Sequence, residues 1–240
     1  MEEIRINKYL SEIGFCSRRG ADQLLDEGRI TVNGQKPEKG TKVTANDVIL
    51  VDGKPVKPDT EAPVYIAFNK PIGIVCTTDT RREKNNIIDY INHPRRIFPI
   101  GRLDKPSEGL ILLTSDGDIV NKILRSRNNH GKEYIVRVDK PITPKFLQKM
   151  RGGVPILDTI TKKCEVEQID TMTFRIVLTQ GLNRQIRRMC EYLGYEVKKL
   201  KRIRVLNIHL DLPLGKWRDL TPKELSDLLD IVEDSSKTND

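Results

Sequence analysis

Most of this chain consists of short apolar runs separated by polar turns, and few helical patterns lie between the runs. In one run Tyr134, Val136 and Val138 occupy every second position, the spacing of a strand with one buried face. A parallel sheet built from strand–helix–strand units would need a helix after nearly every strand. The pattern therefore predicts an α+β fold. The expected strands cover residues 64–68, 97–103, 109–114, 134–138, 161–166 and 174–178, with a last strand ending at Val205.

Capping residues indicate where the few helices of this region begin. Thr143 precedes Pro144, an N-cap followed by a proline in the first turn. Thr221 and Glu224 have the spacing of a capping box, which predicts a last amphipathic helix. A further helix is expected over residues 184–193. Its buried face would consist of Ile186, Met189, Cys190 and Leu193.

The first sixty residues show a different pattern, two helices followed by short strands. Ile6 and Leu10 begin a first helical stripe. A second stripe starts after Ser17, a favoured N-cap residue, and closes at Gly28. The segment Asn33-Gly34 then provides a strong hairpin signal. These signals predict a small α+β module.

A polar, proline-containing stretch, residues 54–60, follows a second strand and turn and is interpreted as a linker. The sequence thus predicts two domains. Residues 1–60 form a small domain with a trailing linker, and residues 61–240 form a larger one.

Positive charge is concentrated in the middle of the chain. The net charge of +8 combines a neutral stretch at residues 1–60, +12 at residues 61–220 and −4 at residues 221–240. Such a concentration of charge attracts polyanions, although a basic pI is also compatible with simple solubility. Residues 181–204 alone hold eight basic and two acidic residues, which predicts a phosphate-binding surface there. Five or six phosphate contacts would give a slope of log affinity against log salt of about −4 to −5.

Several classes of chemistry lack their sequence signals. No P-loop, GxGxxG or GxSxG motif is present, and the three histidines stand apart. The four cysteines form no CxxC pair, so we expect neither a zinc site nor a disulfide framework. The N-terminal residues do not resemble a signal peptide, and no apolar stretch is long enough to span a membrane, which predicts a cytoplasmic protein.

The small domain resembles the RNA-binding domain of ribosomal small-subunit protein four. The resemblance rests on Ile6–Leu10, Gly14, Ser17-Arg18, Ala21, Leu24-Leu25 and the stretch Gly28–Gly34. It implies that Lys8, Arg18, Arg19 and Arg29 contact structured RNA. The alternative is a small helical cap whose charges are only solvated.

A polar loop between two apolar strands contains the best catalytic candidate. In the segment 100–117, which reads IGRLDKPSEGLILLTSDG, Asp104 lies between cationic neighbours that favour its ionised form. An ionised carboxylate suits a nucleophile or a base. This context alone, however, favours a structural role, in which Asp104 caps the loop or pairs with Arg102.

This segment resembles the catalytic motif of the RsuA-like branch of pseudouridine synthases. Companion motifs follow the branch's order: NKPIG at residues 69–73, KEYIV at 132–136 and GLNRQIRRM at 181–189. The resemblance covers essentially the whole chain. It implies a catalytic domain with a mixed, mainly antiparallel sheet and an isomerase that needs no cofactor and no metal.

The resemblance also implies roles for individual residues. Asp104 would be the catalytic carboxylate, Arg187 the basic residue beside it, and Tyr134 the ring that stacks on the extruded uridine. Whether Asp104 attacks the sugar, attacks the base or removes a ribose proton stays open. Further substrate contacts are expected from Arg102, Lys132, Asn183, Arg184, Gln185, Arg188 and Leu200.

Within the branch, the segments 140–143, 153–157 and 188–191 look most like the RluF group, which acts on large-subunit ribosomal RNA. The implied partner is this RNA, free or in an assembling ribosomal subunit, bound by a monomer. A non-catalytic RNA-binding or ribosome-assembly protein on the same fold is the main alternative. A nuclease is disfavoured because clustered carboxylates for a metal are missing.

Overall fold

A computed structural model describes residues 3–57, 61–124 and 130–233 of the chain. The chain divides into two compact units, one within residues 1–63 and the other within residues 64–114 and 118–240. No helix in the described segments is both long enough and apolar enough to cross a membrane.

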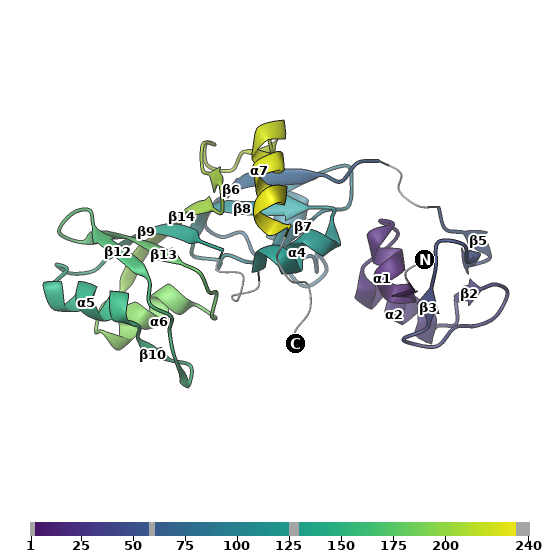
Figure 1. The fold of residues 1–240 in the computed structure, drawn as a ribbon, viewed down its shortest axis with the longest axis horizontal. Helices are drawn as coiled ribbons and strands as arrows, with labels where there is room; N and C mark the ends of the chain where they lie inside the picture. The colour runs from purple at the N-terminus through teal and green to yellow at the C-terminus, as the bar shows by residue number, and fades with distance from the viewer. Residues whose placement is uncertain (1–2, 58–60, 125–129, 234–240) are drawn as a thin grey trace. The chain divides into compact units, whose positions relative to one another are not determined.

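The N-terminal unit contains the two helices expected from the sequence, α1 (Ile6–Glu12) and α2 (Arg18–Asp26) (Figure 1). Ser17 caps α2 by accepting a hydrogen bond from the Gly20 amide at 2.9 Å. The strands are β1 (Ile4–Arg5), β2 (Ile30–Val32), β3 (Lys42–Val43), β4 (Ile49–Val51) and β5 (Lys54–Pro55). The helical stripes and strands enclose one small core of Ile6, Leu10, Ala21, Ile30, Val43, Ile49 and Val51.

The start of the expected linker at residue 54 was wrong. Asp52 and Gly53 both adopt left-handed φ angles, of 51° and 74°, and turn the chain back as β5 against β4. The Val56 amide donates to the Ile49 carbonyl at 3.1 Å, so the unit extends at least to this residue. The remaining part of the expected linker, residues 58–60, lies outside the described residues.

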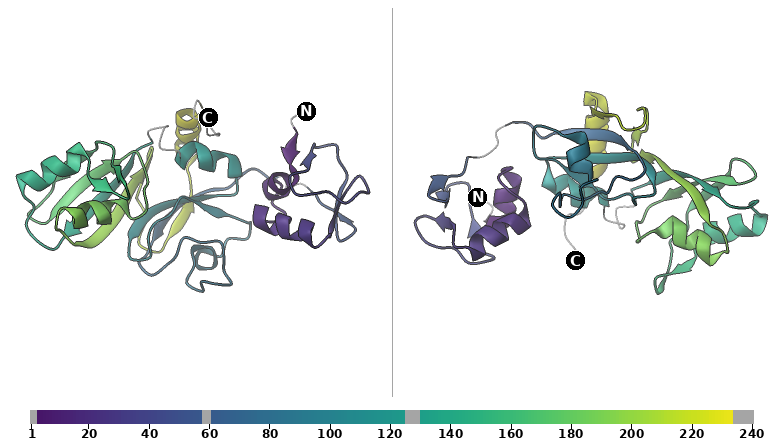
Figure 2. Two further views of the ribbon diagram at one scale, coloured as in Figure 1. Left: turned by 90° about the horizontal axis from the view of Figure 1, so that it is seen from below. Right: turned by 180° about the vertical axis from the view of Figure 1, so that it is seen from behind.

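The second unit is built on a mixed sheet in the order β12-β13-β9-β14-β8-β6-β16, with β7 on β8 and β15 on β14. Its pairings are antiparallel except that of β14 with β8, which confirms the expected sheet type. Figure 2 shows this sheet from below and from behind. The strands are β6 (Tyr65–Lys70), β7 (Phe98–Ile100), β8 (Glu108–Thr114), β9 (Lys132–Val138), β12 (Glu165–Gln168), β13 (Thr173–Leu178), β14 (Val197–Val205), β15 (Ile208–His209) and β16 (Trp217–Asp219).

Both faces of the sheet centre are buried. Along β8, Ile111 and Leu113 belong to one core cluster, while Leu110 and Leu112 belong to the other. This explains why β8 is a continuous apolar run instead of an alternating one. One cluster includes α3 (Ile87–Ile91), α5 (Pro144–Gly152) and α6 (Gln185–Tyr192), and the other includes α4 (Gly117–Leu124) and α7 (Pro222–Val232).

Several local expectations are confirmed and others are wrong. Thr143 caps α5, and the capping box of Thr221 opens α7. The strand expected over 161–166 corresponds to β12, which begins only at Glu165. Thr161 is not part of this strand, because its hydroxyl accepts a hydrogen bond from the Val154 amide. This bond closes a hairpin of β10 (Pro155–Ile156) and β11 (Thr159–Ile160). Residues 69 and 70 extend the strand expected over 64–68 and complete β6. The helices α3 and α4 were not expected from the sequence.

Candidate active site

A basic pocket of about 890 Å³ opens in the second unit. It is lined by residues 75–78, most of 98–105, much of 178–187, and side chains of β9 and β14. Asp104 is the one acidic residue among the residues that line the pocket. Six of the lining side chains are cationic: Arg102, Lys105, Lys132, Arg184, Arg187 and Arg202. The pocket therefore favours a polyanionic ligand.

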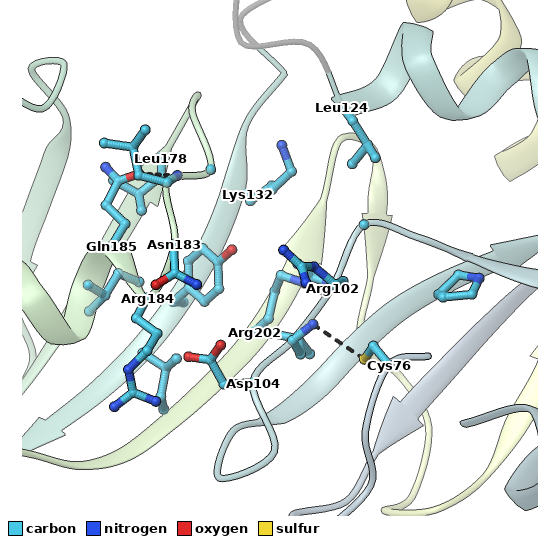
Figure 3. A pocket seen from close by; sticks show the side chains of 18 of the residues that line it. Cys76, Arg102, Asp104, Leu124, Lys132, Leu178, Asn183, Arg184, Gln185 and Arg202 are labelled. Atoms are coloured by element: carbon cyan, nitrogen blue, oxygen red, sulfur yellow. Dashed lines mark hydrogen bonds between the residues drawn. The ribbon is translucent and has the colours of Figure 1, made fainter. Parts of the chain in front are cut away.

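Backbone hydrogen bonds fix the loop that carries Asp104. The Ser107 amide donates to the Asp104 carbonyl at 3.0 Å and closes a turn. The Leu103 amide donates to the Cys76 sulfur at 3.4 Å, and the Gly73 amide donates to the Lys105 carbonyl at 2.8 Å. The motif at residues 69–73 thus supports the loop from outside, and the Asp104 carboxylate lies inside the pocket (Figure 3).

Arg187 lies beside Asp104, as the resemblance implies. Its Nε is 3.9 Å from Asp104 Oδ2, and the two side chains are 14% and 32% exposed. The guanidinium is held in place by donating to the carbonyls of Pro106 and Val197 and to the Ser107 hydroxyl, at 3.1–3.2 Å. Burial lowers the pKa of Arg187, and Arg184 adds to this effect, while Asp104 opposes it. The arginine therefore presents a fixed positive charge to the carboxylate.

One wall of the pocket is formed by neighbouring residues of β9 and β14. Tyr134 pairs with Arg202 across the strands and is 9% exposed. The Arg202 guanidinium lies 6.0 Å from the Tyr134 ring centre. Leu200, also expected at the site, is buried and lines the same wall. An aromatic ring beside apolar and cationic groups can receive a flipped base.

The expected site residues at the start of α6 do not all have the same role: two face the pocket and one supports the loop. Asn183 and Arg184 lie across the pocket from Arg102 and Lys132 in Figure 3. Gln185 is 95% buried, and its side-chain oxygen accepts from the Leu182 amide at 3.0 Å, so it supports the loop.

Arg188 does not line the pocket. It donates to the backbone and side-chain oxygens of Asn183 at 3.0 and 3.2 Å. Arg188 was expected to contact the substrate, but in the structure it braces the Asn183 loop.

Arg202 was not singled out from the sequence although it lines the pocket and is 3% exposed. Its Nε donates to the Leu110 carbonyl at 2.6 Å, which joins β14 to β8. Two register shifts in the β14–β9 pairing, at 197/199 and 202/204, disturb the alternation of β14. The buried arginine therefore had no simple period-two signal.

The basic segment 181–204 exposes fewer charges than its sequence suggested. Arg204 pairs with Glu133 at 2.7 Å, Lys198 pairs with Glu196 at 2.6 Å, and Arg202 is buried. Arg184 and Lys199 remain exposed. Arg204 and Lys198, two of the eight cations of this segment, are thus already paired with carboxylates, so they contribute less to the phosphate-binding surface expected there.

In the N-terminal unit, Arg18 and Arg19 lie exposed in the first turn of α2. Lys8 pairs with Glu12 at 3.1 Å. Arg29 forms ion pairs with Glu27 at 3.0 Å and Asp52 at 2.6 Å, which commits its guanidinium within the unit. Arg18 and Arg19 are thus the better placed of the four predicted RNA contacts.

A carboxylate beside a fixed arginine, in a basic pocket with a buried tyrosine, is an arrangement suited to nucleophilic or acid–base chemistry on a polyanionic substrate. Within the described segments no cluster of three metal-binding side chains is found. Residues 64–192 match the model of the RNA pseudouridylate synthase family, and residues 4–49 match that of the S4 domain. The chain belongs to the RNA pseudouridylate synthase family and is an RNA pseudouridine synthase.

Individual relatives agree with this assignment. The chain is 56% identical to the dual-specificity RNA pseudouridine synthase RluF of Salmonella typhi, over 97% of this chain and 81% of that protein. It is 38% identical to ribosomal large subunit pseudouridine synthase B of Bacillus subtilis, over 95% and 97% of the two chains. A crystal structure of a pseudouridylate synthase aligns with a TM-score of 0.69 and 25% identity, over 94% of this chain and 99% of the other.

Proposed function

We propose that this enzyme converts a uridine of large-subunit ribosomal RNA to pseudouridine and that Asp104 is its catalytic carboxylate. The observation that carries the assignment of Asp104 is its position 3.9 Å from Arg187 in the basic pocket. The choice of RNA is supported by the large-subunit activity named for the Bacillus subtilis relative and by the likeness to RluF.

The reaction breaks the C1′–N1 bond of uridine and joins C1′ to C5, while C5 loses a proton and N1 gains one. No group is added and no electron is transferred. Asp104 acts on the reacting nucleotide as nucleophile or base, and Arg187 orients its carboxylate. Tyr134 stacks on the extruded base and offsets part of the cost of unstacking it.

The substrate proposal is tested by tritium release from transcripts labelled at C5 of uridine, in EDTA. We expect release from large-subunit rRNA and none from small-subunit rRNA. A tRNA arm tests the second kind of substrate that the words "dual-specificity" suggest for the RluF relatives. Release from small-subunit rRNA alone would contradict the proposed substrate. Light scattering of the purified chain tests the expected monomer.

Replacing Tyr134 by alanine is expected to weaken RNA binding about 5- to 150-fold, because stacking on one base contributes about 1–3 kcal/mol. Tyr134→Phe keeps the ring and should bind within a few-fold of the wild type. Filter binding of large-subunit rRNA measures both. Equal binding by all three proteins would remove Tyr134 as the stacking platform.

Replacing Lys199 by alanine is expected to make the slope of log affinity against log salt shallower by about 0.7–0.9, because one exposed phosphate contact is lost. Affinity for unrelated RNAs should fall to the same extent. A matched variant, Lys145→Ala, changes an exposed lysine on α5 and should leave the slope unchanged. An unchanged slope in Lys199→Ala would exclude this residue from the RNA surface.

A further inference from the structure

Lys132 is a largely buried lysine in the pocket wall. The side chain lines the pocket, is 7% exposed, and extends between Leu124 and Leu178 in the view of Figure 3. No hydrogen bond or ion pair to its Nζ is found among the described residues. Buried charges are ordinarily paired, so an unpaired one calls for a ligand of opposite charge.

The surroundings of Lys132 are cationic. Arg202 on β14 repels it, and Arg102 lines the same pocket from the loop after β7. The pKa of His130 is lowered mainly by burial and also by the positive charge of Lys132. The neighbouring carboxylate of Glu133 is already engaged by Arg175 and Arg204. The cluster thus holds uncompensated positive charge inside the molecule.

Arg202 is a second cation at this wall whose hydrogen bonds are only partly satisfied. Its Nε is used by the Leu110 carbonyl, but its buried Nη2 has no hydrogen-bond partner among the described residues. This guanidinium therefore lacks an anionic or acceptor group in the free enzyme. Because a buried N–H without an acceptor is costly, a ligand that supplies one would be favoured.

The position along β9 indicates which anion fits. Lys132 and Tyr134 are two residues apart on one face of the strand, a separation of about 6.6–6.8 Å. A nucleotide whose base stacks on Tyr134 extends its sugar and phosphate away from the ring. Lys132 is therefore placed where backbone phosphate of the same strand can reach, and the ammonium group is a common phosphate ligand.

We propose that Lys132 and Arg202 form a buried subsite inside the pocket for a backbone phosphate of the bound RNA. The inference deepens the proposed function and rests on RNA binding in this pocket. It adds an internal phosphate contact to those on the surface, and makes that contact dependent on the protonation of one lysine.

Burial, together with the repulsion by Arg202, lowers the pKa of Lys132 to about 8. A bound phosphate favours the charged form, so the pKa rises in the complex. Binding therefore takes up a proton above about pH 8, and affinity decreases there by up to about tenfold per pH unit. Below that pH the ammonium is charged in the free enzyme, and affinity is insensitive to pH.

The test compares Lys132→Met and Lys132→Arg with the wild type, in filter binding of a large-subunit rRNA transcript at pH 7, 8 and 9 and fixed salt. Lys132→Met should bind roughly tenfold more weakly or worse at pH 7, with a salt slope shallower by about 0.7–0.9. Lys132→Arg, which stays charged, should bind well at pH 7 and lose the decrease above pH 8. Lys145→Met controls for removal of an exposed lysine.

A stability measurement separates this role from a structural one. In the unfolded chain a lysine has its ordinary pKa near 10.5, so between pH 8 and 10.5 the unfolded state binds more protons and stability rises with pH. Lys132→Met removes the buried charge and should raise the unfolding temperature at pH 7 while weakening RNA binding. A lower unfolding temperature would identify Lys132 as a structural residue and overturn the proposal.

Two further outcomes are distinguishable. If the wild type and Lys132→Arg lose affinity in parallel above pH 8, Lys132 does not bind phosphate as an ammonium, and the subsite is disproved even though the enzyme is active. If the wild type forms no pseudouridine in any rRNA but shows the pH-dependent binding, the subsite stands and the proposed function fails.

Discussion

Replacing Asp104 by asparagine is expected to lower kcat by about 10³-fold or more while RNA binding stays within a few-fold of the wild type. Asparagine has nearly the same shape, but it can act neither as nucleophile nor as base. General acid–base groups typically contribute 10²–10⁴-fold to the rate, and loss of a covalent step costs at least as much. The backbone bonds of the Asp104 loop do not involve the carboxylate, so the loop should keep its conformation.

Tritium release in EDTA and filter binding, run side by side, measure the two effects of Asp104→Asn. Asp158→Asn is a matched control, because Asp158 is exposed, lies in the same unit and has a left-handed φ of 56° that asparagine tolerates. It should retain full activity. If binding by Asp104→Asn falls in step with turnover, or if turnover survives, Asp104 is not the catalytic carboxylate.

Gly109→Ala is expected to destabilise the second unit by about 4 kcal/mol. Gly109 has a φ of +108°, and an added Cβ would lie 2.2 Å from the Arg202 carbonyl oxygen and 2.6 Å from the Arg202 nitrogen. These are backbone atoms of β14 at its only parallel pairing in the described sheet, so β8 and β14 would have to separate. Since Asp104 precedes β8 and Arg202 lies on β14, activity should fall as well.

The fluorescence of Trp217, the only tryptophan of the chain, reports the unfolding of this unit separately because it lies on β16. Its transition should move down by on the order of 10 °C in Gly109→Ala. Gly152→Ala is the matched control, since a Cβ there meets nothing within 4 Å and α5 gains a better helix former. An unchanged transition in Gly109→Ala would show that the two strands can move apart at little cost.

Local structure could be predicted where the signal lies within a few residues. Ser17 caps α2, Thr221 opens α7, and the polar loop with Asp104 lies between β7 and β8, as expected. Caps, turns and periodicity depend on neighbours along the chain, so they can be predicted without knowledge of the tertiary structure. The family motifs also predicted that Arg187 lies beside Asp104, as it does in the structure.

Other features depended on residues far apart in the sequence. The pairing of β14 with β8, the burial of Arg202 and the unpaired state of Lys132 follow from strands that meet only in the folded sheet. Glu133 likewise neutralises Arg204, which the sequence had counted among the charges available to RNA. The sequence by itself therefore determined most of the helices and strands, and its family motifs predicted Asp104 as the catalytic carboxylate. Tertiary structure decided which cations remain free for RNA, because ion pairing and desolvation depend on distances in space.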